Sequence, residues 1–171
     1  MTKLKLKKQT VKAVVIHAVF LIVVYILQAE VFSRIKILGI VPALLPLATI
    51  GVAMLEGNGR GSVFGLFAGI LCDISFNQPA ALMTITLTLV GWFAGRLAET
   101  VVRRGFLAYI VVSLGVLLLV SFVQMFGQLF FEHVPAGALI RTALGQTLIT
   151  LVFTIPMYPV IKSMAKKTNA A

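Results

Sequence analysis

Few side chains in this 171-residue chain could take part in proton transfer or metal binding: five acids, two histidines and one cysteine, Cys72. His17 lies in the first apolar run, His133 between the last two, and Asp73 near the end of a short one. With both termini on one side of a membrane, His17 and Asp73 fall in opposite halves of it, whereas an acid–base pair must meet. We therefore expect no catalytic residues, no metal site and no cofactor, and we interpret His17 as a hydrogen-bonded packing residue.

The stretch Gly57-Asn58-Gly59-Arg60-Gly61 has the glycine content of a phosphate-binding loop. It lacks the Lys-Ser/Thr pair that contacts the phosphates and metal in a P-loop. We interpret it as a tight turn between two helices, since glycine adopts backbone conformations that other residues avoid.

Glycine recurs in the segment that follows. Gly61, Gly65, Gly69 and Asp73 are spaced four residues apart, which places them along one stripe of a helix. In a membrane, such glycines let two helices approach closely. An acid within an apolar helix is a functional candidate by default. Two interpretations of Asp73 stay open, a functional carboxylate and a cap for the loop at the membrane surface.

Polar side chains also recur along three apolar runs, where facing lipid would be costly. Hydrogen bonds within one bundle, a solvated pocket and a groove for another protein's helix stay open as explanations. The stripes are Thr142, Gln146, Thr150 and Thr154; Ser121, Gln124, Gln128 and Glu132; and Thr84, Thr88, Gly91 and Gly95. Our candidates for partner binding or helix packing are Gly61, Gly65, Gly69, Asp73, Gly91, Gly95, Gln124, Gln128 and Gln146.

The composition indicates a membrane protein. Hydrophobic residues make up 60% of the chain, the mean hydropathy is +1.05, and only 12% of residues are charged. Several apolar runs approach or exceed the roughly 20 residues that cross hydrocarbon. A net charge of +10 would suggest nucleic acid for a soluble protein. Here we attribute it to basic residues at the cytoplasmic ends of helices and expect no nucleic-acid partner.

We predict a single all-α transmembrane domain over residues 1–171, a bundle of six helices at about 13–32, 37–55, 61–74, 80–98, 106–131 and 139–161. Pro42 and Pro46 predict that the second helix is kinked early or begins after a short re-entrant turn. The third is too short to cross a bilayer unaided. Twelve of the 15 Lys and Arg residues lie on the side of both termini, which predicts that both termini are cytoplasmic.

The segment GSVFGLFAGILCDI from Gly61 to Ile74, the loop with Pro79, and LTLVGW from Leu87 to Trp92 together resemble the central signature of the rod shape-determining protein MreD family. In that pattern a G-x-x-x-G helix ends in Leu-x-Asp, a short Pro/Gly turn follows, and the next helix has a Gly before an aromatic residue. The specific part spans about Gly61 to Gly95. Ala80 and Ala81 stand where the family usually has Gly after the Pro.

The resemblance implies a non-enzymatic scaffold of the cell-elongation machinery in the bacterial cytoplasmic membrane. Such proteins bind the membrane helix of MreC. They act with MreB, the glycosyltransferase RodA and penicillin-binding protein 2 in side-wall peptidoglycan synthesis and rod shape. Membrane lipid is then the only small ligand we expect, and no small-molecule substrate.

The resemblance also implies a fold similar to the substrate-binding components of energy-coupling-factor transporters, which supplies an alternative function. In that case the polar stripes would line a vitamin pocket, and the Ala94/Ala98 pair would dock the energising subunit. The first helix lacks the Ala-x-x-x-Ala expected for such docking, which favours the scaffold.

Overall fold

The computed structural model describes residues 3–35, 40–75, 81–100, 105–131 and 136–169. The side chains of residues 3–10, 126–128, 130, 131, 136, 138 and 169 lie outside the described set. The described residues form helices and no β-strand. The elements are α1 (Lys3–Ile26), the π-helical turn η1 (Leu27–Phe32), α2 (Ser33–Ile35), α3 (Leu44–Glu56), α4 (Asn58–Ser75), α5 (Leu82–Thr100), α6 (Phe106–Phe131), α7 (Ala136–Val152) and α8 (Thr154–Asn169).

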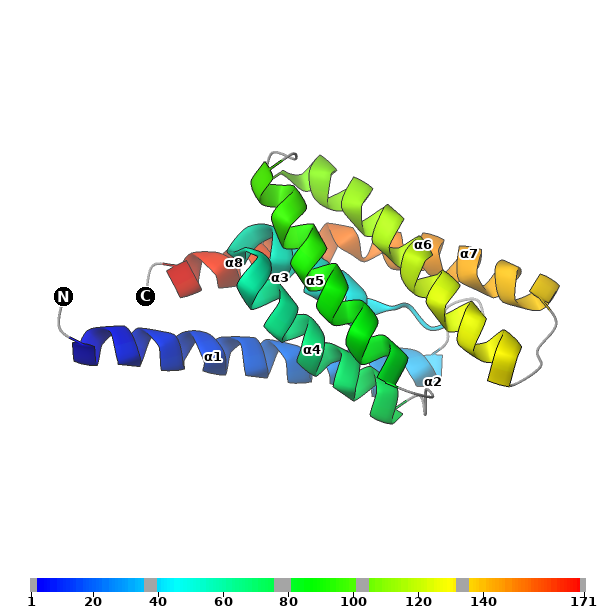
Figure 1. Cartoon of the computed structure of the whole chain (residues 1–171), viewed down its shortest axis with the longest axis horizontal. Coiled ribbons are helices and arrows are strands. Elements are labelled where there is room, and N and C mark those ends of the chain that lie inside the picture. The colour runs from blue at the N-terminus through cyan, green and yellow to red at the C-terminus, as the bar shows by residue number, and fades with distance from the viewer. Residues whose placement is uncertain (1–2, 36–39, 76–80, 101–104, 132–135, 170–171) are drawn as a thin grey trace.

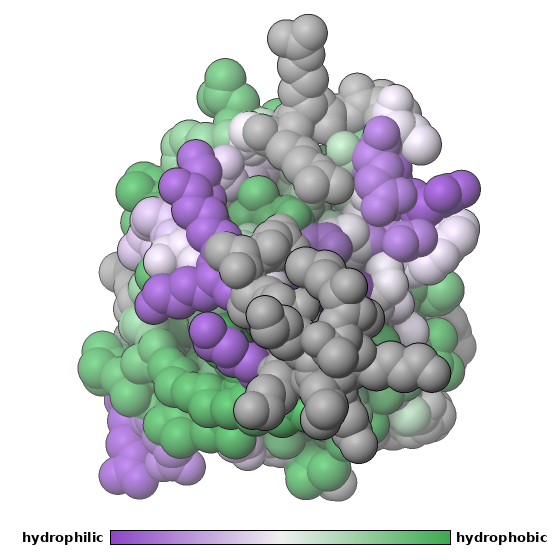
Figure 2. All heavy atoms as spheres, turned by 90° about the vertical axis from the view of Figure 1, so that its left-hand side faces the viewer, coloured by the Kyte–Doolittle hydropathy of each residue, from purple (hydrophilic) through white to green (hydrophobic). Residues whose placement is uncertain are grey.

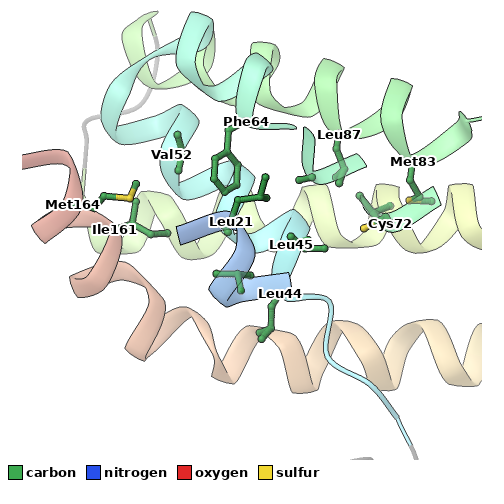
Figure 3. Close-up of a cluster of buried hydrophobic side chains, with 14 residues drawn as sticks. Leu21, Leu44, Leu45, Val52, Phe64, Cys72, Met83, Leu87, Ile161 and Met164 are labelled. Atoms are coloured by element: carbon green, nitrogen blue, oxygen red, sulfur yellow. The ribbon is translucent and has the colours of Figure 1, made fainter. Parts of the chain in front are cut away.

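Helix α3 is the centre of the fold. Every residue from Leu44 to Met54 is buried, and α1, α4, α5, α6 and α8 all contact this helix. Its sequence, LLPLATIGVAMLE, is apolar on all sides until Glu56, which is the pattern of a helix surrounded by protein. Figure 3 shows one part of this core, in which Leu45 and Val52 of α3 lie among Leu21, Phe64 and Ile161 from three other helices.

Helices α1, α4, α5, α6 and α8 surround α3, and α7 packs on α6. Helices α4 and α5 run side by side over most of their length, and α6 and α7 form a second pair (Figure 1). The beginning of α1 and the end of α8 lie at the same end of the molecule (Figure 1). Large apolar side chains cover much of the outside, including Val19, Phe93, Val111 and Leu148, each at least half exposed. A lipid-facing surface has this character.

Within the described residues, two helices are long and apolar enough to cross a membrane, Val11–Ile35 and Phe106–Met125. A third span arises if Leu139–Val152 and Thr154–Thr168, bent by 53° at their junction, count as one. The chain is therefore an all-helical membrane protein. The six-span arrangement remains a prediction, and so does its likeness to energy-coupling-factor components.

Two helices differ from the sequence-based ranges because of proline. The second predicted helix begins at Leu44 in the described residues rather than near residue 37. Pro46 has no N–H to offer the carbonyl four residues earlier and its ring crowds that carbonyl, which favours a helix that begins after Pro42. The last predicted helix, 139–161, is broken between Val152 and Thr154, where Pro156 offers no N–H to the Val152 carbonyl and favours a kink or break.

Two further helices begin earlier in the chain than the sequence predicted. Helix α1 begins at Lys3, well before the expected residue 13, and α4 begins at Asn58 rather than Gly61. The turn between α3 and α4 is thus the single residue Gly57, whose φ of 99° lies in the region that favours glycine. At 18 residues, α4 is longer than expected and rises about 27 Å.

Candidate functional site

The glycine stripe of α4 lies inside the bundle, against α5 and α3. A Cβ added at Gly61 would meet Ala53 of α3 and the Gly91 carbonyl of α5. A Cβ at Gly65 would overlap the backbone carbonyl of Leu87. Because backbone cannot move aside as a flexible side chain can, these positions admit only glycine at this helix separation.

The same contact continues along both helices. A Cβ at Gly69 would overlap the backbone of Thr84, and one at Gly95 would overlap the backbone of Asn58. Gly91 lies against the Gly61 carbonyl, so glycines from both helices face each other. Gly61, Gly65, Gly69, Gly91 and Gly95 therefore act in packing α4 against its neighbours, and none of them is exposed to a partner.

Asp73 caps α5. Its Oδ1 accepts a hydrogen bond from the Met83 N–H at 3.0 Å, and its Oδ2 accepts from the Thr84 N–H at 2.9 Å and from the Thr84 hydroxyl at 2.6 Å. The first amides of a helix have no partner within the helix. A carboxylate there satisfies them and interacts favourably with the helix dipole. Of the two interpretations left open by the sequence, the geometry favours the cap.

The residue before α5 has an unusual backbone. Ala81 has a φ of 53°, the only positive φ at a non-glycine residue in the described ranges. That conformation costs an L-residue roughly 1–2 kcal/mol, and glycine adopts it freely. Ala80 and Ala81 are where this sequence departs from the MreD pattern, and Ala81 is where glycine would fit best.

The polar stripe of α7 supports the unwound segment in front of α3. The Gln146 amide donates to the Val41 carbonyl at 3.1 Å, and the Thr150 hydroxyl accepts from the Ala43 N–H at 2.9 Å. Irregular backbone at membrane depth is tolerated only where protein or water satisfies its polar groups. Of the three explanations for the polar stripes, Gln146 and Thr150 fit hydrogen bonding within one bundle.

A residue that the sequence analysis passed over completes this support. Gln28, 5% exposed, lies in the π-helical turn η1, and its Oε1 accepts from the Leu45 N–H at 2.8 Å. A buried amide in an apolar helix must have a partner. That rule marks Gln28 as a contact residue, but only the tertiary structure identifies Leu45.

The α6 stripe makes weaker contacts. The Gln124 amide approaches the Met83 sulfur at 4.0 Å, and the Ser121 and Thr147 hydroxyls are 3.4 Å apart. The side chain of Gln128 and all of Glu132 lie outside the described residues. The Thr147 hydroxyl donates to the Ala143 carbonyl within α7, and the Thr154 hydroxyl at the start of α8 donates to the Leu151 carbonyl near the end of α7.

The candidates chosen from the sequence also did not include the buried carboxylate of Glu56. The Glu56 side chain at the end of α3 is fully buried, and its Oε2 lies 3.1 Å from the His17 Nε2 and 3.0 Å from the Arg60 Nη1. The His17 Nδ1 is 2.7 Å from the Ala13 carbonyl oxygen. His17 is therefore a packing residue held by polar contacts, and the cluster joins α1 to the α3–α4 turn. The i, i+4 spacing of Glu56 and Arg60 was the available signal.

The described ranges hold no group of three His, Cys, Asp or Glu side chains that could bind a metal ion. Comparison with protein-family models, curated proteins and solved structures finds no match to this chain.

Proposed function

We propose that this protein is a non-enzymatic membrane scaffold of the MreD kind in the bacterial cytoplasmic membrane. In this role it binds the membrane helix of MreC and acts with MreB, RodA and penicillin-binding protein 2 in side-wall peptidoglycan synthesis. The observation that carries the proposal is the α4–α5 pair. The residues on which the resemblance rests, Gly61 to Asp73 and Gly91, form one close-packed unit capped by Asp73.

The polar residues support a scaffold rather than a transporter. Gln146, Thr150 and Gln28 bond to the backbone around the start of α3. Transporters often bind anionic groups at the free amides of such a broken helix. Here the Leu44 N–H bonds to the Pro42 carbonyl, the Leu45 N–H bonds to Gln28, and Pro46 has no N–H. The first amides of α3 are therefore already occupied.

The docking face required by the alternative is also covered. Ala94 and Ala98 are 3% and 7% exposed and belong to a core cluster with residues of α3 and α6. A vitamin-transporter component would need this small-residue pair on its surface. The scaffold needs only an exposed apolar helix face, and α1, α5, α6 and α7 each have one.

Crosslinking in cells tests the proposal and identifies the face. A photoreactive amino acid is placed singly at Val19, Phe93, Val111 and Leu148, one exposed position on each of four helices. We expect crosslinks to MreC from one helix or two neighbouring ones, and rounded cells when the protein is depleted. Absence of crosslinks from all four positions, together with normal rods on depletion, would contradict the scaffold. A tightly copurifying vitamin would favour the alternative.

The membrane orientation has its own test. Both termini are proposed to be cytoplasmic, and the beginning of α1 and the end of α8 lie at one end of the molecule (Figure 1). A reporter enzyme fused after Lys167 should be active only inside the cell. Activity only outside the cell would contradict this orientation.

A further inference from the structure

The exposed cations gather at one end of the bundle. At the end where α1 begins and α8 finishes, the described exposed cations are Lys12, Arg60, Arg96, Lys162, Lys166 and Lys167. At the opposite end, those described are Arg34, which bonds to Glu30 at 3.1 Å, and Arg141. Figure 2 views the molecule from the cationic end and shows hydrophilic residues around that face.

Two helices bring most of this charge together. Leu21 of α1 and Ile161 and Met164 of α8 belong to one buried cluster, with Ile16 and Phe20 packed against it. From this contact, α1 runs back towards Lys12 and α8 runs on to Lys166 and Lys167, and both head for the same end of the molecule (Figure 1). Lys12 and the last turn of α8 therefore lie at the same end of the molecule, on two helices that contact each other (Figure 1).

Helix α1 also begins well before its first buried residue among the described side chains. That residue is Ala13, yet the helix begins at Lys3. Ten further residues extend it by about 15 Å. This extension contains four more lysines, Lys3, Lys5, Lys7 and Lys8.

The acids at this end neutralise little of that charge. Glu56 is buried and already paired with Arg60. Glu99, the other described acid there, lies on α5, beside Gly57 rather than on α1 or α8. On α8, Lys162 lies over the Tyr158 ring with its Nζ 5.7 Å from the centroid, while Lys166 and Lys167 are exposed in the last turn.

We propose that the beginning of α1 and the end of α8 bind the phosphate headgroup of an anionic phospholipid. The ligand is a lipid because the exposed surface next to these lysines is apolar, with Val14, Val15 and Val160 each more than half exposed. Acyl chains can lie on this surface while the phosphate meets the lysines. Basic residues beside a membrane helix attract anionic headgroups in this way.

Native mass spectrometry of the purified full-length chain measures this binding directly. The probes are phosphatidylglycerol and phosphatidylcholine with identical acyl chains, added to the protein in detergent. The test variant is Lys166→Gln/Lys167→Gln. The matched control, Arg34→Gln/Arg141→Gln, removes two cations from the opposite end.

We expect the unmodified protein to bind phosphatidylglycerol more tightly than phosphatidylcholine, and the preference to shrink in high salt because salt screens exposed charges. At about fivefold for each lysine near the surface, the test variant should lose roughly 25-fold in affinity for phosphatidylglycerol at low salt. The affinity of the control variant for phosphatidylglycerol should change less than about twofold. Its two cations lie at the opposite end of the molecule, roughly a bilayer thickness from Lys166 and Lys167. Equal binding of the two lipids by the unmodified protein would overturn the proposal. So would equal losses in the two variants.

Discussion

Asp73 and Thr84 are joined twice, since the Asp73 Oδ2 accepts hydrogen bonds from both the amide and the hydroxyl of Thr84. The two residues lie on successive helices, so a carboxylate in the last turn of α4 caps the first turn of α5. The glycine contacts hold α4 and α5 close together. The bonds of the cap add a second constraint, which fixes the position of one helix along the axis of the other.

Replacing Asp73 with Ala should destabilise the protein by about 1–2 kcal/mol, the usual value of a lost helix cap. Unfolding in detergent micelles, followed by circular dichroism, measures the change. Thr84→Val removes one of the bonds to Asp73 and should cost less than Asp73→Ala. If Asp73→Ala unfolds like the unmodified protein but fails to copurify MreC, the carboxylate is functional and our assignment as a cap is wrong.

Gly65→Ala should lower the free energy of unfolding by about 1–3 kcal/mol or more. The added methyl group overlaps the Leu87 backbone and forces α4 and α5 apart. The matched control is Gly115→Ala on α6, where nothing lies within 4 Å of the added atom. That change should be neutral or stabilising, since Ala is the better helix former. Equal unfolding midpoints for the two variants would show that the α4–α5 contact is looser than described.

Ala81→Gly should stabilise the protein by about 0.5–1 kcal/mol. Relief of the positive φ is worth roughly 1–2 kcal/mol, and the greater freedom of glycine in the unfolded chain offsets part of it. Ala18→Gly, at an exposed position within α1, should instead destabilise by about 1 kcal/mol. If Ala81→Gly and Ala18→Gly shift the midpoint of thermal unfolding in the same direction, the positive φ assigned to Ala81 is contradicted.

Thr150→Val preserves shape but leaves the Ala43 N–H without its partner. Leaving a buried donor unsatisfied costs about 1–3 kcal/mol, and Thr150 is 0% exposed. Thr88→Val is the matched control, because the Thr88 hydroxyl donates only to the Thr84 carbonyl one turn earlier. It should cost distinctly less. Hydrogen exchange at the start of α3 should increase in Thr150→Val alone.

Glu56→Gln should destabilise by about 1.5–3 kcal/mol, the range for hydrogen bonds to charged groups. It removes the buried charge that attracts Arg60 and His17. Glu30→Gln removes the acid of an i, i+4 pair whose side chains are 62% and 82% exposed, and should change stability by less than about 0.5 kcal/mol. Similar losses in both would mean that water reaches Glu56.

Much of this could be predicted from the sequence because it depends on periodicity. The four-residue spacing of Gly61, Gly65 and Gly69 identified a close helix contact. The stripe on the last predicted helix identified inward-facing groups at Gln146 and Thr150, whereas Thr142 of the same stripe is exposed. Their partners could not be predicted, because periodicity says which face of a helix is buried and not what lies opposite it. Leu87 faces Gly65, and Val41 receives Gln146, only once the helices are packed.

Helix ends were harder to predict, for local reasons. Pro42 and Pro46 are compatible with a kink or with a late start, and only the bonds from Gln28 and Thr150 make the late start stable. The break before Thr154 follows from Pro156, but a proline kink and two separate helices look alike in sequence. The pairing of Glu56 with Arg60 has a signal in the sequence, but its contact with His17 does not, because His17 lies on another helix.

The bonds that support the start of α3 also impose an order on assembly. The Ala43 N–H and the Val41 carbonyl meet partners 107 and 105 residues further along the chain. During synthesis, those groups must wait until Gln146 and Thr150 have been made. The residues in front of α3 therefore reach their final hydrogen bonds only after α7 is in place. A chain stopped after α6 would contain the α4–α5 pair and would lack both of these partners.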